Sequence, residues 1–426
     1  MGIGARTYRL AHHVWGRLPP ETRRRLFYDV TGRLAPKPDR VPGPDAAPVT
    51  VAGLLTATTG LGQGARLSLA AFRDLGVDTR WADLAPSFDQ SDLRDAPEWP
   101  GRPAAPGESG TLLVHVNGPY LPFALWRLGP QIVRRKRVVG FWFWELPAMP
   151  ADWARGLRFV HEVWTSSQFS ARSFGDTGGR PVRVVPLYLP PPPPPAFTRS
   201  DLGIPADALV TASFFHMGSS FSRKNPVASV HAFRKAFGDD PKRVLLLRVV
   251  EPHLAPWAQS LLADAIGGAG NIRLFKEKMS RAEITGLLEA SDIVLSLHRS
   301  EGFGLVPAEA MQLGKVVVAT GWSGNMDFMT PDNSIPVGYR LIPARDPQGT
   351  YDMSDQVWAD ADVEEAAAAL RRLAGDPALR AGLGRTARAD AARLFGPDAY
   401  AAALRGDAST LRAPADGAAA GAAPVA

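Results

Sequence analysis

A run of six prolines at residues 190–195 restricts how this chain can fold. Proline fixes its own φ angle and has no N–H group, so neither a helix interior nor a central strand accepts such a run. The run is typical of a stiff polyproline segment. We therefore predict that residues 190–196 link two separately folded parts. A ligand site is expected between these parts, because clefts between domains are preferred places for ligands.

Both parts alternate short apolar runs with stretches of helical periodicity. This alternation predicts an α/β chain whose two halves are each built on an open sheet of parallel strands. The predicted strands of the first part include residues 49–55, 111–116, 160–167 and 182–187, and those of the second are residues 209–215, 243–250, 271–275, 292–297 and 315–319.

The composition excludes several classes of protein. The sequence has no cysteine, which rules out disulfides, thiolate catalysis and cysteine-based zinc sites. No run reaches the roughly 18–20 apolar residues of a membrane span. The first residues do not resemble a secretory signal, because arginines interrupt their apolar positions. We predict a cytoplasmic protein that can bind peripherally at the inner face of the membrane.

Positive charge is concentrated at the N-terminus. Residues 1–40 hold nine Arg or Lys and three Asp or Glu, and so account for the whole net charge of +6. A basic footprint outside the folded domains argues against a nucleic-acid binder. Apolar residues such as Leu26, Val30 and Leu34 recur among the arginines, which predicts either a helix docked on the protein or a helix that contacts an anionic membrane. A second basic run, residues 134–137, is predicted to be a solvated helix end.

Two glutamates eight residues apart, Glu301 and Glu309, flank a Gly-Phe-Gly turn. The apolar run before them predicts a buried strand, and residues 307–313 predict a helix that ends at Gly314. In a parallel sheet, a ligand lies beyond the carboxyl end of a strand and meets the N-terminus of the next helix. Both glutamates, and the later loop that contains Asn325, are therefore expected to face one crevice.

Two other strand-to-helix turns carry residues suited to phosphate. Arg223 and Lys224 follow Ser220 in a loop of small residues, where an arginine fork and a lysine point charge suit a diphosphate. The alternative is a pair of solvated surface cations. Gly60 and Gly62 lie in the turn after the first strand, where backbone N–H groups can reach phosphate or sugar. Any tight turn of this kind also favours glycine.

Trp144 and Glu145 end a strand-like run that begins at Val138. An aromatic ring beside a carboxylate suits a carbohydrate, which stacks on the ring and hydrogen-bonds to the carboxylate. Core packing is the alternative for the tryptophan. Asn117 follows the strand that contains His115, and this histidine is expected in the core rather than in catalysis.

The stretch from Glu301 to Glu309 resembles the paired-glutamate motif (E-x7-E) of retaining glycosyltransferases of family 4, which have the GT-B fold of two Rossmann-like domains facing across a cleft. Residues 223–226 (Arg-Lys-Asn-Pro) resemble the phosphate-binding loop of that family, and residues 60–62 (Gly-Leu-Gly) its N-terminal glycine turn. Residues 142–147 and 162–167 are similar to a subgroup that builds bacterial surface polysaccharides. The resemblance covers about residues 49–405.

The resemblance implies a role for each matching position. Glu309 would hold the ribose hydroxyls of a nucleotide, and Glu301 would orient the transferred sugar. Arg223 and Lys224 would stabilise the departing diphosphate, where charge builds in the transition state. The other donor-binding residues that it implies are Gly302, Phe303, Gly304, Leu305, Val306, Gly60, Gly62, Ser220 and Asn325, with the N–H of Gly62 directed at the diphosphate. The residues on the acceptor or sugar side are Trp144, Glu145 and Asn117.

The implied activity is transfer of a hexose or deoxyhexose, with retention, from a nucleotide-diphosphate sugar to a glycan, a lipid-linked glycan or another hydroxyl acceptor. No cofactor or metal is implied, because the basic pair replaces the cation and no Asp-x-Asp lies in a suitable loop. The alternatives are a nucleotide-sugar epimerase of the same fold and a non-catalytic nucleotide-sugar-binding protein.

Two positions depart from the family pattern. Ser219 stands where many members have an arginine before the loop lysine, which leaves that task to Arg223. Trp144 stands where many members have the histidine of a His-x-His-Glu-Pro segment, which moves the expected sugar contact to Glu145.

The predicted organisation has six segments. They are a basic extension at residues 1–48, an acceptor-side domain at 49–189, the linker at 190–196, a donor-binding domain at 197–395, a closing helix at 396–412 and a disordered tail at 413–426.

Overall fold

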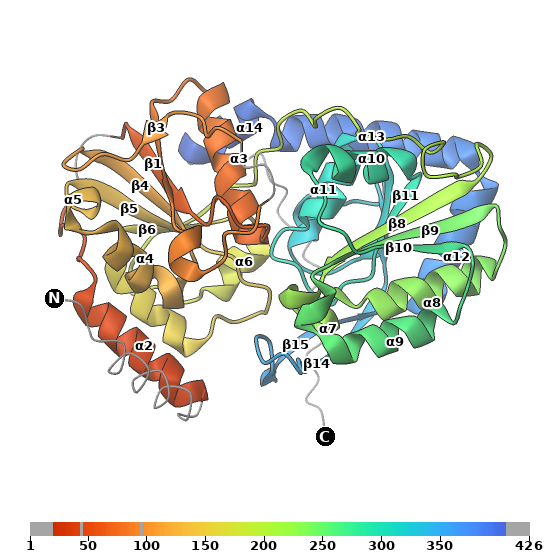
Figure 1. Cartoon of the computed structure of the whole chain (residues 1–426), viewed down its shortest axis with the longest axis horizontal. Coiled ribbons are helices and arrows are strands. Elements are labelled where there is room, and N and C mark those ends of the chain that lie inside the picture. Colours follow the sequence, from red (N-terminus) through yellow and green to blue (C-terminus); the bar gives the residue numbers. More distant parts are fainter. Residues whose placement is uncertain (1–19, 43–45, 94–96, 406–426) are drawn as a thin grey trace.

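The computed structural model describes residues 20–42, 46–93 and 97–405, which form two parallel sheets and a smaller antiparallel hairpin (Figure 1). The predicted disordered tail and the apolar residues before Pro20 lie outside the described residues.

The first sheet has seven parallel strands in the order β3-β2-β1-β4-β5-β6-β7. Its strands are β1 (Val49–Gly53), β2 (Thr79–Asp83), β3 (Arg102–Pro103), β4 (Gly110–His115), β5 (Lys136–Phe141), β6 (Glu162–Thr165) and β7 (Val182–Val184). The helices of this part are α3 (Gly60–Asp74), α4 (Leu121–Leu128), α5 (Pro130–Val133) and α6 (Gln168–Ser173). The continuous burial of β1 and β4 fits strands that are covered on both faces.

The second sheet has six parallel strands in the order β10-β9-β8-β11-β12-β13. Its strands are β8 (Leu209–His216), β9 (Arg243–Val250), β10 (Ile272–Phe275), β11 (Ile293–Ser296), β12 (Val316–Thr320) and β13 (Ile335–Val337). The helices that cover it are α8 (Pro226–Phe237), α9 (Pro256–Ile266), α10 (Arg281–Ala290), α11 (Leu305–Gln312) and α12 (Val363–Gly375). Leu245 and Leu247 pack with α8, α9 and α12, whereas Val244 and Leu246 pack with α10, so the sheet is doubly wound.

A hairpin that the sequence did not predict, β14 (Tyr339–Ala344) and β15 (Met353–Ala361), projects from the second domain. It lies at the lower edge of the molecule between the two halves (Figure 1). Ala344, Tyr351 and Trp358 pack into a core cluster of the first domain. The hairpin therefore belongs to one domain by sequence and contacts the other.

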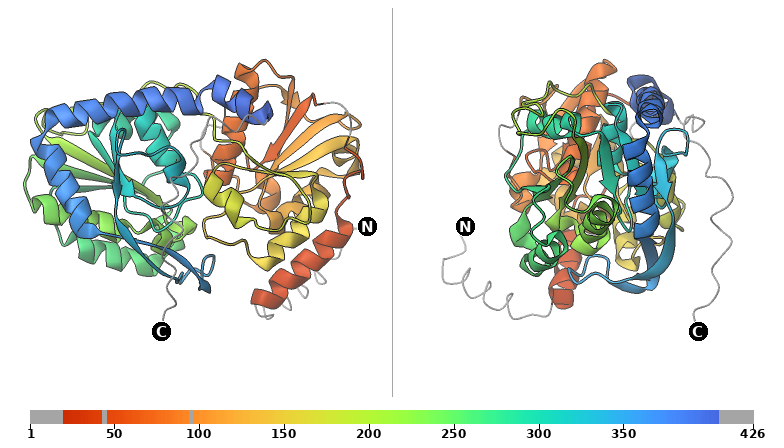
Figure 2. Two further views of the ribbon diagram at one scale, coloured as in Figure 1. Left: turned by 180° about the vertical axis from the view of Figure 1, so that it is seen from behind. Right: turned by 90° about the vertical axis from the view of Figure 1, so that its right-hand side faces the viewer.

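The chain crosses between the domains twice. Residues 190–195 have no regular secondary structure, as the proline run predicts, and the second crossing follows helix α13 (Pro377–Phe395). Helix α14 (Pro397–Arg405) then returns to the first domain, where Tyr400 packs on Phe72 and donates a hydrogen bond to Ser68 (3.2 Å). Seen from behind, α13 runs along the upper edge of the molecule towards α14 (Figure 2).

Helix α2 (Pro20–Leu34) packs against the first domain. The ring of Phe27 packs at a tilt against Phe123 (5.3 Å between centroids), and Arg155 pairs with Asp29 across the contact (2.7 Å). The docking interpretation of this helix is confirmed for these residues.

The expectation of a solvated helix end at residues 134–137 is confirmed for Arg134 and Arg135, which are exposed at the end of α5, but it is wrong for Lys136. Lys136 begins β5 and is almost fully buried, and its ammonium donates to the carbonyl of Ser109 (3.0 Å). The aliphatic part of the Lys136 side chain lies at the edge of the core, and its ammonium group reaches a hydrogen-bond acceptor. The number of charged residues in a segment does not predict such an arrangement. The expectation for His115 is confirmed: it is fully buried and stacks on Phe141.

Candidate active site in the cleft between the two domains

The cleft lies where the carboxyl ends of the central strands of both sheets face each other. Both sheets reverse their strand order between the central strands, at β1/β4 and at β8/β11, and such points are where open α/β sheets bind ligands. The cleft has a volume of about 1330 Å³. The segments that follow β1, β4, β8 and β11 all line it, as the sequence predicts.

The basic loop after β8 is shaped by two residues in the left-handed region. Ser220 (φ 66°) caps the short helix α7 (Phe221–Lys224) by accepting from the N–H of Arg223, and Asn225 (φ 48°) ends it. The hydroxyl of Ser220 donates to Asp346 (2.9 Å), and Ser220 is not among the residues that line the cleft. Ser220 therefore positions the loop, and Ser219 and Lys224 face the cleft.

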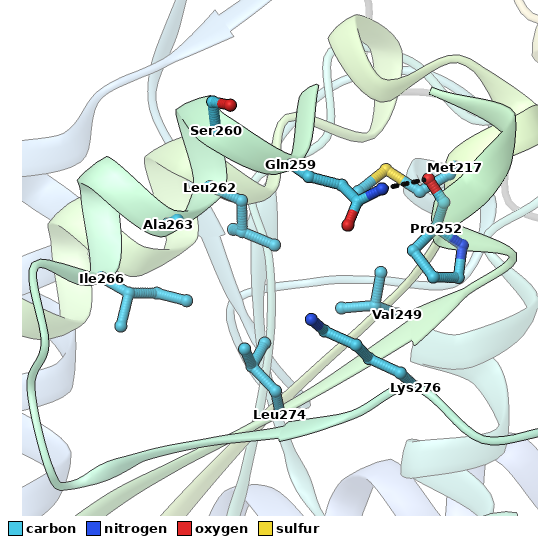
Figure 3. Close-up of a pocket in the computed structure, with 10 residues that line it drawn as sticks. All are labelled: Met217, Val249, Pro252, Gln259, Ser260, Leu262, Ala263, Ile266, Leu274 and Lys276. Carbon is cyan, nitrogen blue, oxygen red and sulfur yellow. Dashed lines mark hydrogen bonds between the residues drawn. The ribbon is translucent and has the colours of Figure 1, made fainter. Parts of the chain in front are cut away.

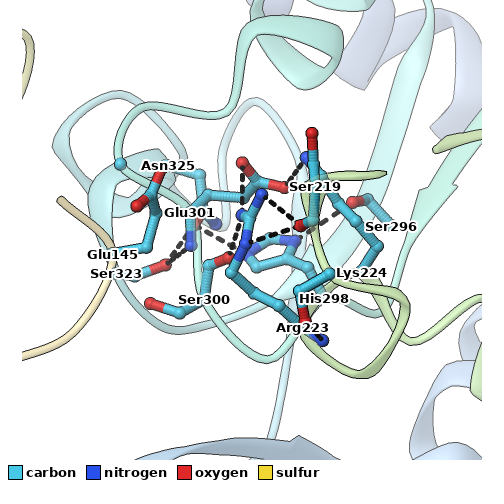
Figure 4. Close-up of polar contacts among 12 residues, drawn as sticks. Glu145, Ser219, Arg223, Lys224, Ser296, His298, Ser300, Glu301, Ser323 and Asn325 are labelled. Atoms are coloured by element: carbon cyan, nitrogen blue, oxygen red, sulfur yellow. Dashed lines mark hydrogen bonds and ion pairs between the residues drawn. The ribbon is translucent and has the colours of Figure 1, made fainter. Parts of the chain in front are cut away.

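Arg223, Lys224 and Glu301 form a compact charged cluster (Figure 4). Lys224 pairs with Oε1 of Glu301, and a guanidinium nitrogen of Arg223 lies 3.2 Å from Oε2. Arg223 also donates to the carbonyls of Ser219 and Ser300. The three side chains, which come from segments 77 residues apart, meet as the sequence predicts.

The charges in this cluster fix its ionisation. Burial alone would raise the pKa of Glu301, but Lys224, Arg223 and His298 lower it to about 2. Burial alone would lower the pKa of Arg223, but Tyr351 and Glu301 raise it above its ordinary value. Glu301 is therefore a carboxylate at neutral pH, and it cannot act as a general acid there.

The loop that carries Glu301 is held from behind by buried polar residues. The N–H of Glu301 donates to Ser323 (2.8 Å). His298 bonds to Ser296 and to Asn325 (both 3.0 Å), and burial lowers the pKa of His298, so a neutral ring fits both partners. Asn325 is fully buried and does not line the cleft, so it positions the loop rather than a ligand.

The turn that follows Glu301 lines the cleft along its whole length. Gly302, Phe303, Gly304, Leu305 and Val306 are all lining residues. Gly304 has a φ of 94°, a conformation that glycine adopts without strain.

Glu309 lies on α11 and faces the same cleft, with its side chain almost fully buried. Arg281, at the start of α10, donates to its Oε1 (2.7 Å). Arg281 and the nearby Arg248 were not singled out from the sequence. Burial, together with the charge of Arg281, lowers the pKa of Arg248 to about 10, which still leaves it cationic at neutral pH.

Of the two glycines in the turn after β1, one lines the cleft and the other packs in the interior. Gly60 lines the cleft, but the N–H of Gly62 donates to Thr59 (3.2 Å), which caps α3. A β-carbon on Gly62 would lie 2.4 Å from the carbonyl oxygen of Leu54, so close packing requires this glycine. Arg66 donates to the carbonyls of Leu55 and Ala57 and also lines the cleft.

The acceptor-side residues from the sequence belong to the first domain, and the segment that holds Trp144 and Glu145 lies close to Gly302 of the Glu301 loop. Glu145 accepts from the hydroxyl of Tyr351 on the hairpin (2.8 Å). Trp144 is buried, with its ring against Trp153 and Tyr351 and its indole N–H bonded to Ala148. Core packing, the alternative kept open for this tryptophan, therefore describes most of its surface.

Asn117 lines the cleft and accepts from the backbone N–H of Phe143 (2.9 Å), which ties the ends of two strands together. Tyr351 was missed from the sequence, because it lies in a hairpin tip with no periodicity to place it.

A second hollow, of about 290 Å³, lies beneath α9 in the second domain (Figure 3). Its walls are mainly apolar, with Leu262, Ile266 and Leu274 around Lys276. Among the described residues, no three His, Asp or Glu side chains gather in a way that could hold a metal ion. The charged side chains that are suited to binding or catalysis lie together in the larger cleft instead.

Comparison with known proteins agrees with this geometry. Residues 213–390 match the family model described as glycosyl transferases group 1. In structure the protein is similar to Anabaena HepE, solved with UDP and glucose (TM-score 0.58, 16% identity, 85% of this chain and 99% of that one). It is also similar to WaaG, a glycosyltransferase involved in lipopolysaccharide biosynthesis (TM-score 0.53, 14% identity, 84% of this chain and 98% of that one).

The chain has the GT-B fold. Curated relatives include proteins named D-inositol 3-phosphate glycosyltransferase. The one from Saccharomonospora viridis is 31% identical over 47% of this chain and 42% of its own length, and the one from Streptomyces bingchenggensis is 28% identical over 50% and 44%. The match thus spans less than half the length of these relatives. The group 1 region of this GT-B protein contains the whole basic loop after β8, as well as Glu301 and Glu309.

Proposed function

We propose that this protein is a retaining glycosyltransferase that moves a hexose or deoxyhexose from a nucleotide-diphosphate sugar to a hydroxyl of a glycan or lipid-linked glycan, in polysaccharide or glycoconjugate biosynthesis. The observation that carries the proposal is the cluster of Arg223, Lys224 and Glu301 in the cleft, with Glu309 on the next helix. The matching group 1 region and the GT-B fold support it.

The cluster can serve each part of the transfer. The acceptor oxygen attacks the anomeric carbon on the face that the leaving group occupies, and the bond from that carbon to the diphosphate oxygen breaks. The acceptor proton passes to the departing diphosphate. Arg223 and Lys224 stabilise the charge that develops on this diphosphate, which is the largest expected contribution to the rate. Glu301 orients the sugar, and Glu309 holds the ribose.

We propose that the transfer needs no metal, because two cations already stand where a divalent ion would neutralise the diphosphate. Turnover is expected to be unchanged after treatment with EDTA. A requirement for added Mg²⁺ or Mn²⁺ would contradict this part of the proposal.

The donor is tested first by thermal stability with a panel of nucleotide sugars and free nucleoside diphosphates. UDP and UDP-glucose head the panel, because crystals of HepE contained them. A ligand at 100 times its dissociation constant stabilises the folded state by about 2.7 kcal/mol. No stabilisation by any nucleotide would contradict donor binding. Release of nucleoside diphosphate that requires an acceptor would separate a transferase from an epimerase.

We propose in addition that α2 binds an anionic membrane surface. Leu26, Val30 and Leu34, spaced by four residues, are 41–51% exposed, and Arg23 and Arg33 lie close to the same side of the helix. An apolar line flanked by arginines complements anionic lipid. No helix among the described residues is long and apolar enough to span a bilayer.

Co-sedimentation with vesicles tests this contact. The protein is expected to sediment with vesicles that contain phosphatidylglycerol, and to do so less with pure phosphatidylcholine. Replacing Leu26, Val30 and Leu34 with serine should abolish the difference, whereas Leu261→Ser, an equally exposed leucine on α9, should not. Unchanged sedimentation of the triple variant would exclude α2 as the contact.

A further inference from the structure

The cleft extends beyond Glu301 into an end with a different chemistry. We call this the acidic–aromatic end and define it by six lining residues, Tyr28, Tyr120, Glu145, Asp152, Tyr351 and Asp352. They come from α2, from the short helices η2 (Gly118–Tyr120) and η3 (Ala151–Phe159), from the segment after β5 and from the hairpin.

Contacts link five of these residues in two groups. Tyr351 donates to Glu145 (2.8 Å) and lies beside Trp144, which packs in turn on Trp153 (5.0 Å between ring centroids). On the other side, the rings of Tyr28 and Tyr120 lie 6.0 Å apart. Asp152 precedes Trp153 and pairs with Arg24 of α2 at 3.7 Å.

The end adjoins the charged cluster. The guanidinium of Arg223 lies over the ring of Tyr351, 5.2 Å from its centroid. A β-carbon on Gly302 would lie 3.6 Å from Oε1 of Glu145. A group bound at the acidic–aromatic end would therefore lie next to a sugar held by Glu301.

The cleft has room for a second substrate. Pockets that hold one drug-sized ligand measure roughly 300–1,000 Å³, and the cleft measures about 1330 Å³. The donor half contains the cations Arg66, Arg223, Lys224, Arg248 and Arg281. A diphosphate belongs in that half, which leaves the acidic–aromatic end for the other substrate.

The charge of this end discriminates between acceptors. Three carboxylates, Glu145, Asp152 and Asp352, line it. The nearby lining cations are Arg24, which is paired with Asp152, and Arg223, which lies over Tyr351 at the border with the donor half. A phosphate would meet like charge at this end, whereas sugar hydroxyls can donate to carboxylates and sugar rings can stack on tyrosines.

Resting on the glycosyltransferase function proposed above, we propose that the acidic–aromatic end is the acceptor subsite and that it takes an unphosphorylated saccharide. In this respect the protein would differ from the curated relatives, whose names specify a phosphorylated inositol. The N-terminal helix α2 and the hairpin tip would then contribute to acceptor choice.

The test compares matched acceptors. Methyl glycosides of glucose, galactose and mannose are set against the 6-phosphates of the same sugars and against inositol 3-phosphate, with release of nucleoside diphosphate as the readout. We expect stimulation by at least one methyl glycoside and none by the phosphates. Stimulation by a phosphate that exceeds that by its parent sugar would overturn the proposal, and so would the absence of stimulation by every methyl glycoside.

A charge variant sharpens the test. Asp352→Lys, at an exposed position of the hairpin tip, should raise the rate with sugar phosphates relative to neutral sugars by about fivefold, the upper range for an exposed charge pair. Asp355→Lys makes the same change on the same hairpin away from the cleft lining and should have no effect. Equal effects of the two variants would overturn the assignment.

The proposed function has a test of its own, because it predicts that a nucleotide stabilises the protein against heat in the absence of any acceptor. Loss of that stabilisation would count against the donor site, whereas stabilisation without acceptor discrimination would count only against the acceptor subsite.

Discussion

At the scale of single residues, the candidate site is an ion cluster whose members differ in how replaceable they are. Glu301 has two cationic partners, whereas Lys224 has one carboxylate partner. Removing one member of a buried pair is costly when the other is left uncompensated. The variant that best separates chemistry from folding is therefore the one that leaves every buried charge with a partner.

Lys224→Ala meets this condition, because Glu301 keeps Arg223 at 3.2 Å. We expect turnover to fall by about 100-fold or more, the effect of removing one group that stabilises transition-state charge, with little change in the unfolding transition. The rate of nucleoside diphosphate release measures this. Lys242→Ala, which removes an exposed lysine paired with Asp207, is the control. A near-normal rate in Lys224→Ala would contradict the role of this lysine.

Tyr351→Phe removes one hydroxyl and keeps the ring over Arg223. The lost bond to Glu145 joins the two domains, and a hydrogen bond to a charged group contributes about 1.5–3 kcal/mol. We expect the free energy of unfolding to fall by about that amount in urea titrations. Tyr339→Phe is a matched control on the same hairpin, since its hydroxyl has no hydrogen bond among the described residues. Equal stability of the two variants would show that the hydroxyl of Tyr351 adds nothing.

At the scale of elements, the N-terminus of α6 is capped from the other domain. Ser167 caps α6 and donates to the carbonyl of Gly302 (2.6 Å), while Asp327 in the second domain accepts from the N–H of Gln168 (2.6 Å). Burial raises the pKa of Asp327 to about 6, although the hydrogen bond from Gln168 acts against this. The contact between the domains is therefore sensitive to pH.

The sign of this dependence follows from proton binding. Between about pH 4 and pH 6 the folded protein holds a proton on Asp327 that the unfolded chain has lost, so stability falls as pH rises through this window. Relative to Asp327→Asn, the wild type should lose up to about 3 kcal/mol across it. Urea titrations of both proteins at several pH values measure the difference. Parallel pH profiles of the two proteins would exclude Asp327 as the source.

The sequence predicts elements well where their residues follow a period and poorly where they depend on distant partners. Strands β1, β8, β11 and β12 are apolar runs that both faces bury, so their composition alone identifies them. The hairpin β14–β15 escaped prediction because much of its surface is exposed, so neither strand shows a continuous apolar run.

The same distinction applies to the site. The sequence allowed us to predict that Arg223 and Lys224 lie close to Glu301, because the loops that follow parallel strands lie at the same edge of the sheet. Helix α11 begins at Leu305, two residues before the predicted start at Pro307, because a helix tolerates proline within its first turn. The pairing of Arg281 with Glu309, and the burial of Asn325, depend on how separate elements pack, and no local pattern records that.

At the scale of the whole molecule, α14 attaches the segment that follows the second domain to the first domain. Tyr400 is almost fully buried there, against Phe72 and Ser68, and Arg183 donates to the carbonyl of Leu404. The second domain is therefore attached to the first at both of its ends, through residues 190–195 and through α14.

Tyr400→Ala should release this connection. Loss of a large buried aromatic side chain costs about 3–5 kcal/mol, and here the loss falls on the contact between domains. We expect calorimetry to resolve two unfolding transitions in the variant where the wild type shows more overlap. Tyr339→Ala, at a partly exposed tyrosine of the hairpin, serves as the comparison. A single transition shifted to lower temperature would mean that α14 stabilises the first domain without coupling the two.

The two crossings of the chain also touch each other, since the N–H of Leu189, just before the prolines, donates to the carbonyl of Phe395 at the end of α13 (3.0 Å). They lie along the upper edge of the molecule, and the hairpin spans its lower edge (Figure 1). The chain connects the two domains on one side alone, so we expect that side to act as the hinge axis. The other side is held by packing of the hairpin on the first domain and by hydrogen bonds. The bond of Tyr351 with Glu145 contributes about 1.5–3 kcal/mol and that of Gln356 with Ala148 about 1 kcal/mol. We expect hinge opening of the two domains to pivot about the proline side and to separate them first at the hairpin, on the microsecond-to-millisecond timescale of such motions.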